Sequence, residues 1–335
     1  MKKLFALAAV VAVALTSCVT TTEIPDPAGE IAFEAFNFKA QSRVYGPIVG
    51  SAYPENEHFG AYAFYTELPN AVYMNDVEIQ KDTDGAWRNT TQKYYWPKGG
   101  TLKFWCYSPY EYATDGEGNR IAPAVNHETG FTFTDFTITN DLAKQIDLMS
   151  TNVVPEARPA AVAAVFHHLL AQVGFTAQYN STASTASATI TLDRVELSNV
   201  KSKGTYTAGG WTALSDENKL TYDFVSGGDG NAQTLTATAQ PVLPKSVPNA
   251  TNALVIPQDG TKGNGDIIAT IDYTTTYDTG AVDKVKNVTY EIPAAWEAGK
   301  KYIYVITVGV GGEITFNPTV HNWEAEGNGG TITVG

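Results

Sequence analysis

The residue with the clearest chemical context is Cys18, one of two cysteines in this 335-residue chain. Two lysines precede an unbroken apolar run over residues 4–15, and Leu15-Thr16-Ser17-Cys18 completes the segment. A positive start and an apolar run too short to span a bilayer are typical of a secretory signal. The small residues before the cysteine resemble a bacterial lipobox, which predicts cleavage between Ser17 and Cys18 and acylation of the Cys18 thiol. An ordinary signal peptide with an incidental cysteine is the alternative.

Acyl chains on Cys18 would hold the exported chain to the cell outer membrane. Residues 1–17 are then the signal peptide, and residues 18–30, which are mostly small, polar or acidic, form a lipidated tether. The second cysteine, Cys106, has no partner within the chain once Cys18 is acylated, so we expect no intramolecular disulfide. Stability must therefore come from packing.

The charge of the chain excludes one class of partner. The sequence has 35 acidic and 22 basic residues, a net charge of −13. Loss of the signal peptide removes two lysines and makes the mature chain more negative still. Nucleic acid binds basic surfaces, so we expect no nucleic-acid partner.

A search for catalytic and metal-binding patterns gives no candidate. The chain contains no G-x-S-x-G, H-E-x-x-H or C-x-x-C. Adjacent His167 and His168 point apart on a strand or a helix and make a poor chelate. The acidic, glycine-containing stretches 82–87 and 115–126 depart from the EF-hand spacing and read as hairpin turns. We expect a protein that is not an enzyme and has no metal site and no cofactor.

Apolar and polar residues alternate along most of the chain. Clear examples are 102–107, 287–292 and 302–308, each bounded by Gly, Pro, Asn or Asp. This period of two predicts strands, whereas helix signals are confined to 142–148 and 160–170. We predict an all-β protein with two tandem β-sandwich domains of transthyretin-like or Greek-key type.

The division between these domains is placed at a proline-containing stretch. Residues 153–161, VVPEARPAA, end a polar segment, so we predict an N-terminal domain over 31–158 and a C-terminal domain over 159–335. The low-complexity stretch 180–188 is the alternative linker, although its alternation continues into the next strand and favours a surface hairpin.

The stretch EIAFEAFNFKAQSRVYG, residues 30–46, is an unusually apolar strand to follow a tether. Ile31 and Phe33 lie on one face, and Phe36 and Phe38 have the opposite parity. The strand must therefore contain a bulge near Ala35 or be buried on both faces.

The order of these features, with Arg43 some 25 residues after the lipid cysteine, resembles the fimbrillin family of type V pilins. Two later segments carry the same resemblance, QKYYWPKGGTLKFWCYSPY at 92–110 and WEAGKKYIYVITVGVGGEITFNPTVHNW at 296–323. Their patterns, YWP-x3-L-x-F and W-x-x-G-K-x-Y…I-x-F-x-P…W, are fairly specific together and weak apart.

The resemblance implies a mechanism of assembly. An Arg-specific protease would cut between Arg43 and Val44 and remove the first strand, Ile31 to Lys39. The groove left behind would accept a strand from another fimbrial subunit, and residues 314–335 would contain the strand that this chain donates. Here the sequence departs from the family, because only TITVG follows the flexible stretch after Trp323, and Pro318 would interrupt a longer donor. A non-polymerising anchor or tip subunit is therefore a second interpretation of the sequence.

The sequence as a whole predicts a surface-exposed fimbrial subunit or adhesin-like lipoprotein. Its expected partners are other fimbrial subunits, the outer membrane through lipid, and a host or bacterial surface glycan or protein. The alternative is a carbohydrate-binding lipoprotein of a glycan-uptake system, which would keep its first strand and expose a row of aromatic residues such as Trp87, Trp211 and Trp323. A glycoside hydrolase is a third reading, and it needs two carboxylates facing each other in a cleft.

Overall fold

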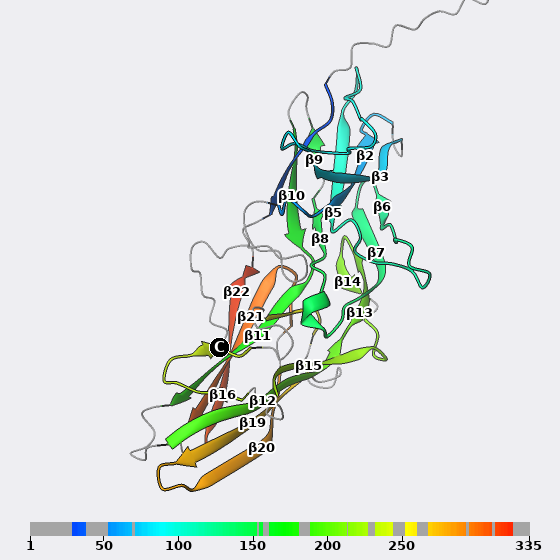
Figure 1. The fold of residues 1–335 in the computed structure, drawn as a ribbon. Helices are drawn as coiled ribbons and strands as arrows, with labels where there is room; N and C mark the ends of the chain where they lie inside the picture. Colours follow the sequence, from blue (N-terminus) through cyan, green and yellow to red (C-terminus); the bar gives the residue numbers. More distant parts are fainter. Residues whose placement is uncertain are drawn as a thin grey trace, which may run out of the picture.

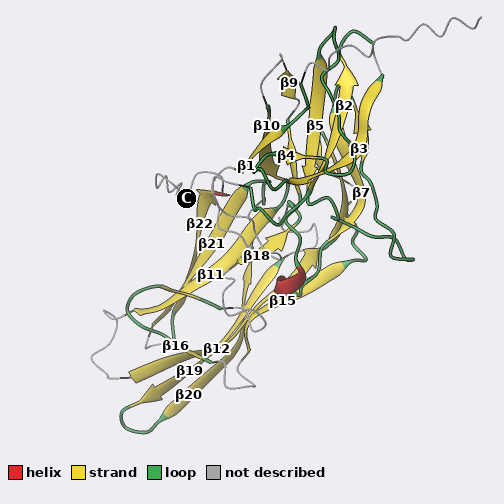
Figure 2. Cartoon of the chain, turned by 45° about the horizontal axis from the view of Figure 1, so that its top comes forward, coloured by secondary structure: helices red, strands yellow, loops and turns green. Residues whose placement is uncertain are grey.

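In the computed structural model of the chain, the regular secondary structure consists almost entirely of strands (Figures 1 and 2). It describes residues 29–37, 53–68, 71–152, 154–156, 161–180, 188–212, 214–226, 232–243, 252–259, 267–292, 295–309 and 312–323. Within these ranges there are 22 strands and one 3-10 helix, η1 (Leu142–Lys144). The prediction of an all-β protein is confirmed. None of the described helical segments is long and apolar enough to cross a membrane.

The first part of the chain forms an eight-stranded sheet in the order β2-β3-β4-β1-β10-β8-β5-β9. Its strands are β1 (Phe33–Asn37), β2 (Phe59–Tyr65), β3 (Val72–Lys81), β4 (Trp87–Arg88), β5 (Leu102–Ser108), β8 (Met149–Thr151), β9 (Val154–Glu156) and β10 (Val162–His168). Because β2 also pairs with β5, all of these strands except β9 form a closed ring, seen at the upper end of Figure 1. Aromatic, aliphatic and small side chains fill its interior.

A four-stranded sheet, β14-β13-β7-β6, lies beside the ring. Its strands are β6 (Ala124–Asn126), β7 (Gly130–Thr137), β13 (Lys203–Thr207) and β14 (Gly210–Thr212). It joins distant parts of the sequence, since Lys203 pairs with Thr137. An aromatic cluster that includes Tyr107, Phe133 and Trp323 packs here and connects the two ends of the molecule.

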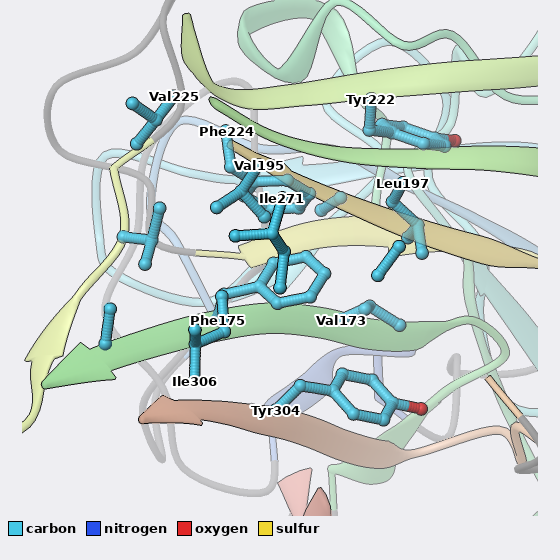
Figure 3. Packing of buried hydrophobic residues seen from close by; sticks show 14 of the residues in the cluster. Val173, Phe175, Val195, Leu197, Tyr222, Phe224, Val225, Ile271, Tyr304 and Ile306 are labelled. Carbon is cyan, nitrogen blue, oxygen red and sulfur yellow. The ribbon is translucent and has the colours of Figure 1, made fainter. Parts of the chain in front are cut away.

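The rest of the chain forms two further sheets that face each other. One contains β11 (Ala171–Asn180), β17 (Gln240–Pro241), β18 (Asn252–Val255), β21 (Lys300–Gly309) and β22 (Ile314–Asn322). The other contains β12 (Ala188–Lys201), β15 (Lys219–Ser226), β16 (Gln233–Thr234), β19 (Ile268–Tyr277) and β20 (Val282–Glu291). Figure 3 shows Phe175 and Tyr304 of the first sheet packed toward Val195 and Ile271 of the second, and all four are buried.

Neither of the two segments predicted to be helical forms an α-helix. Residues 142–148 contain only the single turn η1, which Asp141 caps by accepting a hydrogen bond from the Ala143 N–H. Residues 160–170 form strand β10, in which buried and half-buried residues alternate. Its neighbours β1 and β8 supply the hydrogen bonds that decide in favour of a strand. The domain division at 158 and 159 stays a prediction, and β10, which follows that point, belongs to the ring.

Cys106 lies inside the ring on β5 and is fully buried. Burial raises the pKa of its thiol far above the ordinary range, because the thiolate would lose its hydration. We therefore expect no reaction with a water-soluble disulfide reagent at about pH 8 while the protein is folded. Addition of guanidinium should restore rapid labelling. Labelling of the folded protein at the rate of the unfolded chain would contradict this placement.

Candidate functional site

The first strand, β1, closes the ring between β10 and β4. It runs parallel to β10 in an unbroken register from Phe33 opposite Val162 to Asn37 opposite Phe166. On its other side it pairs with β4 at a single position, where Phe33 lies opposite Trp87. Without β1, both neighbours would present unpaired backbone N–H and C=O groups, which is the state that recruits another strand.

The inward face of β1 and of the residues just before it is apolar and well packed. Ile31, two residues before β1, is 3% exposed, and Phe33 is 2% exposed. The Phe33 ring packs edge-to-face against Phe59 and Phe104, with 5.7 Å between ring centroids in both pairs. Aromatic pairs in this geometry add to the stabilisation from burial. Removal of β1 would therefore open an apolar slot through the wall of the ring.

The prediction that Ile31 and Phe33 share one face is confirmed. The expectation of a bulge near Ala35, or of burial on both faces, is wrong. The pairing with β10 continues through Ala35 without a shift, and Phe36 points outward with 41% of its surface exposed. One face of β1 is buried and the other lies at the surface, as in any strand of a closed ring. Phe38 lies outside the described residues.

A charged group holds the chain where it enters β1. The Glu30 carboxylate is 3.3 Å from both Arg88 Nη1 and Lys93 Nζ, and the Glu30 side chain is only 18% exposed. Asp82 and Asp84 also contact Arg88. Such a carboxylate, mostly withdrawn from water, depends on its cationic partners. We call Arg88 and Lys93 the cationic clamp.

Backbone hydrogen bonds on both sides fix the same segment. The Ile31 N–H donates to the Tyr94 carbonyl at 2.8 Å, and the Trp96 N–H donates to the Gly29 carbonyl at 3.0 Å. The Val162 N–H donates to the Ala32 carbonyl at 2.8 Å. These bonds set the register of any strand that occupies the slot.

The remaining residues predicted from the sequence fall in different places. Ser17, Cys18, Arg43 and Val44 lie outside the described residues, and so does the final stretch 324–335. The predicted donor region therefore contributes only β22 to the described structure, as an edge strand antiparallel to β21.

Pro318 does not interrupt the ladder of β22, contrary to the expectation. It lies opposite Tyr304 within a register that continues to both ends of the strand. Because β22 is an edge strand, the proline nitrogen can face the open side, where no ladder hydrogen bond is required.

The exposed aromatic row of the carbohydrate-binding alternative does not form from the three tryptophans named for it. Trp87 is 7% exposed and Trp323 is 1% exposed. Trp211 is half-buried, and its indole N–H donates to the Leu169 carbonyl at 2.6 Å. All three are structural residues of the described molecule.

The residues that sequence reasoning missed are Glu30, Arg88 and Lys93 of the charged group. Glu30 and Arg88 are separated by 58 positions, so local spacing gave no signal of their contact. A glutamate directly before an inward-facing Ile-x-Phe was the only available hint.

Comparison with solved structures finds chains of similar fold. Among solved structures, similar folds include a fimbrial protein from Bacteroides vulgatus, at 18% identity and a TM-score of 0.56, covering 88% of this chain and 99% of that one. A candidate cell adhesion protein from Bacteroides ovatus has 17% identity and a TM-score of 0.51, covering 88% and 98% of the two chains. One from Bacteroides uniformis has 20% identity and a TM-score of 0.50, with the same coverage.

No match was found among curated proteins. A family model for fimbrillin-like proteins, however, matches residues 43–323, which is most of the chain. These residues include the segments whose YWP and W-x-x-G-K-x-Y patterns carried the resemblance. The chain therefore belongs to the fimbrillin-like family.

Proposed function

We propose that this protein is a fimbrial subunit that loses β1 by proteolysis and accepts a strand from another subunit in its place. In this proposal Cys18 carries the lipid that holds the precursor at the outer membrane, and the cut falls between Arg43 and Val44. The protein is a structural component and catalyses no reaction. Its assembled form serves adhesion, with a glycan or protein on a host or bacterial surface as the target.

The position of β1 is the observation that carries the proposal. This one strand completes the ring between β10 and β4, and its inward side chains are almost fully buried. An incoming strand would satisfy the free backbone groups and cover the apolar slot at the same time. Since the acceptor slot and the donated strand are different surfaces, each contact leaves a free slot and a free donor. Such head-to-tail contacts build a filament.

The place of β1 in the sequence agrees with this mechanism. The family match begins at Arg43, so β1 precedes the region shared with the fimbrillin-like family. The side chains between β1 and Arg43 include no second arginine, which makes Arg43 the first site for an Arg-specific protease after the strand.

The N-terminus of the protein sheared from intact cells tests this proposal. We expect polymeric protein to begin at Val44, and Arg43→Ala protein to begin at acylated Cys18 and to remain monomeric. Arg43→Lys is the matched control, because it keeps the charge but removes the site of an Arg-specific protease. Polymers that still begin at Cys18 would contradict removal of β1, and monomers that begin there would indicate an anchor or tip subunit.

A further inference from the structure

The chain uses arginine sparingly and keeps it away from exposed positions. Its arginines are Arg43, Arg88, Arg120, Arg158 and Arg194, and its other basic residues are lysines. The structure describes Arg88, Arg120 and Arg194, and none of the three is exposed. Every exposed lysine or arginine side chain within the described residues belongs to a lysine, namely Lys93, Lys98, Lys144, Lys219, Lys284 and Lys286. Arginine is rarely withdrawn from water unless it is paired, so the partners of these three side chains decide what the pattern means.

Arg120 is held by three residues, although it lies in a loop between β5 and β6. Its Nη2 donates to the Asp76 carboxylate, and its Nη1 donates to the Tyr107 hydroxyl at 2.8 Å. The guanidinium also lies over the Tyr110 ring, with 3.9 Å from Cζ to the ring centroid. Only 22% of the Arg120 side chain and 14% of the Asp76 side chain are exposed. Release of this guanidinium would break a charge-assisted hydrogen bond and leave a largely buried carboxylate without its cation.

Arg88 has three carboxylate partners, which belong to Glu30, Asp82 and Asp84. Its side chain is 19% exposed. Glu30 would leave with β1 in the proposed cleavage. Asp82 and Asp84 lie in the turn between β3 and β4, so they would stay beside Arg88 afterwards.

Arg194 is protected by its backbone as well as by its side chain. It lies in β12, which pairs with β15 on one side and with β19 on the other. Its Nε is 3.4 Å from the Asp272 carboxylate, and its Nη2 donates to Asn287 Oδ1 at 3.1 Å. Arg158 lies outside the described residues, and Pro159 follows it. Proline has no backbone N–H and restricts the residue before it, so the bond between Arg158 and Pro159 is a poor protease substrate.

An Arg-specific protease of the trypsin type must take the arginine side chain into a pocket that carries its own acidic group. A guanidinium that already has partners in its own fold must leave them first. We propose that Asp76 and the carboxylates beside Arg88 and Arg194 withhold these arginines from such a protease, so that it cuts after Arg43 and spares the described fold. The inference rests on the proposed removal of β1 and adds the residues that restrict cleavage to one bond.

Asp76→Asn tests the contact on which Arg120 depends. Asp76 has φ of +51°, which asparagine also adopts, so the substitution removes the charge and keeps the shape. Loss of the charge-assisted hydrogen bond should raise the rate of cleavage after Arg120 by about tenfold or more. Asp76→Asn/Arg120→Lys is the matched control and should lose this cut. An unchanged rate after Arg120 in Asp76→Asn protein would overturn the role of Asp76.

Lys98→Arg gives a test that does not disturb any of these contacts. Lys98 is exposed, as are Gly99 and Gly100 after it, so the substitution places an arginine in an accessible loop. Full-length Lys98→Arg protein should be made in an Arg43→Lys background, which keeps β1 in place. We expect an Arg-specific protease to cut after position 98 at least about 100-fold faster than after Arg88, Arg120 or Arg194, with the products identified by mass. A Lys-specific protease should cut the parent protein after Lys98, which checks that the loop is accessible.

The outcomes separate this inference from the function on which it rests. Cuts after Arg88, Arg120 or Arg194 at the rate of the cut after position 98 would overturn the protection. Resistance at position 98 to the Arg-specific protease alone would also overturn it, because an exposed arginine would then be spared as well. If position 98 is cut and protein with native Arg43 is not cut after that residue, the proposed removal of β1 fails while the protection stands.

Discussion

Replacement of Phe33 by alanine should lower the free energy of unfolding of the uncleaved protein by about 3–5 kcal/mol. The Phe33 side chain is 2% exposed and contacts Phe59 and Phe104, so its loss removes buried surface and leaves a cavity inside the ring. The ring cannot collapse easily around that cavity, because β1 is paired on both sides. Urea unfolding followed by tryptophan fluorescence measures the change.

Phe36→Ala is the control for this prediction. It removes the same side chain from the same strand, three residues later, where 41% of the residue surface is exposed. Substitutions at such surface positions usually change stability by less than about 0.5 kcal/mol, and partial burial of Phe36 sets a loss of about 1 kcal/mol as the upper bound. Equal losses for the two variants would mean that Phe33 does not fill the slot as described.

Comparison of the Phe33→Ala and Phe36→Ala proteins also tests whether cleavage after Arg43 requires release of β1. A weaker β1 leaves the slot more readily, so Phe33→Ala protein should be cleaved after Arg43 faster than Phe36→Ala protein. Proteolysis of a transiently opened segment follows the population of its open form when closing is fast. Cleavage at equal rates would indicate that the protease reaches Arg43 without release of β1.

Strands could be predicted from the sequence wherever the alternation of side chains is local. Residues 102–107 and 302–308 alternate clearly, and the structure places β5 and β21 there. Alternation follows from the geometry of a single extended chain and needs no knowledge of its partners. The same reasoning placed Ile31, two residues before β1, and Phe33, its first residue, on one face.

Features that depend on distant partners could not be predicted in this way. The small residues of β10 suit a helix as well as a strand, and its pairing with β1 and β8 decides the outcome. From the sequence alone, Pro318 predicts a break in the hydrogen-bond ladder, and only the structure shows that β22 is an edge strand in which proline is tolerated. The closure of the ring by β1 depends on six other strands and has no signature within residues 30–46. The sequence therefore indicated that β1 is a strand, but it did not indicate that this strand closes a ring.

The contacts of His168 with Asp147 and Trp323 also depend on distant partners and could not be predicted from the sequence. Adjacent His167 and His168 do face opposite sides of β10, as their spacing predicts, and the His168 side chain is 1% exposed. Its Nδ1 lies 3.0 Å from the Asp147 carboxylate, which is equally buried. The Trp323 ring stacks on the imidazole with the two centroids 3.7 Å apart. Nothing in the spacing of these residues along the chain indicates their contact.

Trp323→Ala should lower the free energy of unfolding by about 3–5 kcal/mol, as for other large aromatic side chains removed from a core. Trp323 is 1% exposed, and its backbone N–H donates to the Gly299 carbonyl at 2.9 Å. Trp323→Phe is the matched control, since it keeps an aromatic ring over His168 and should lose roughly half as much. Urea unfolding gives the two values, and losses of the same size would show that stacking on His168 contributes little.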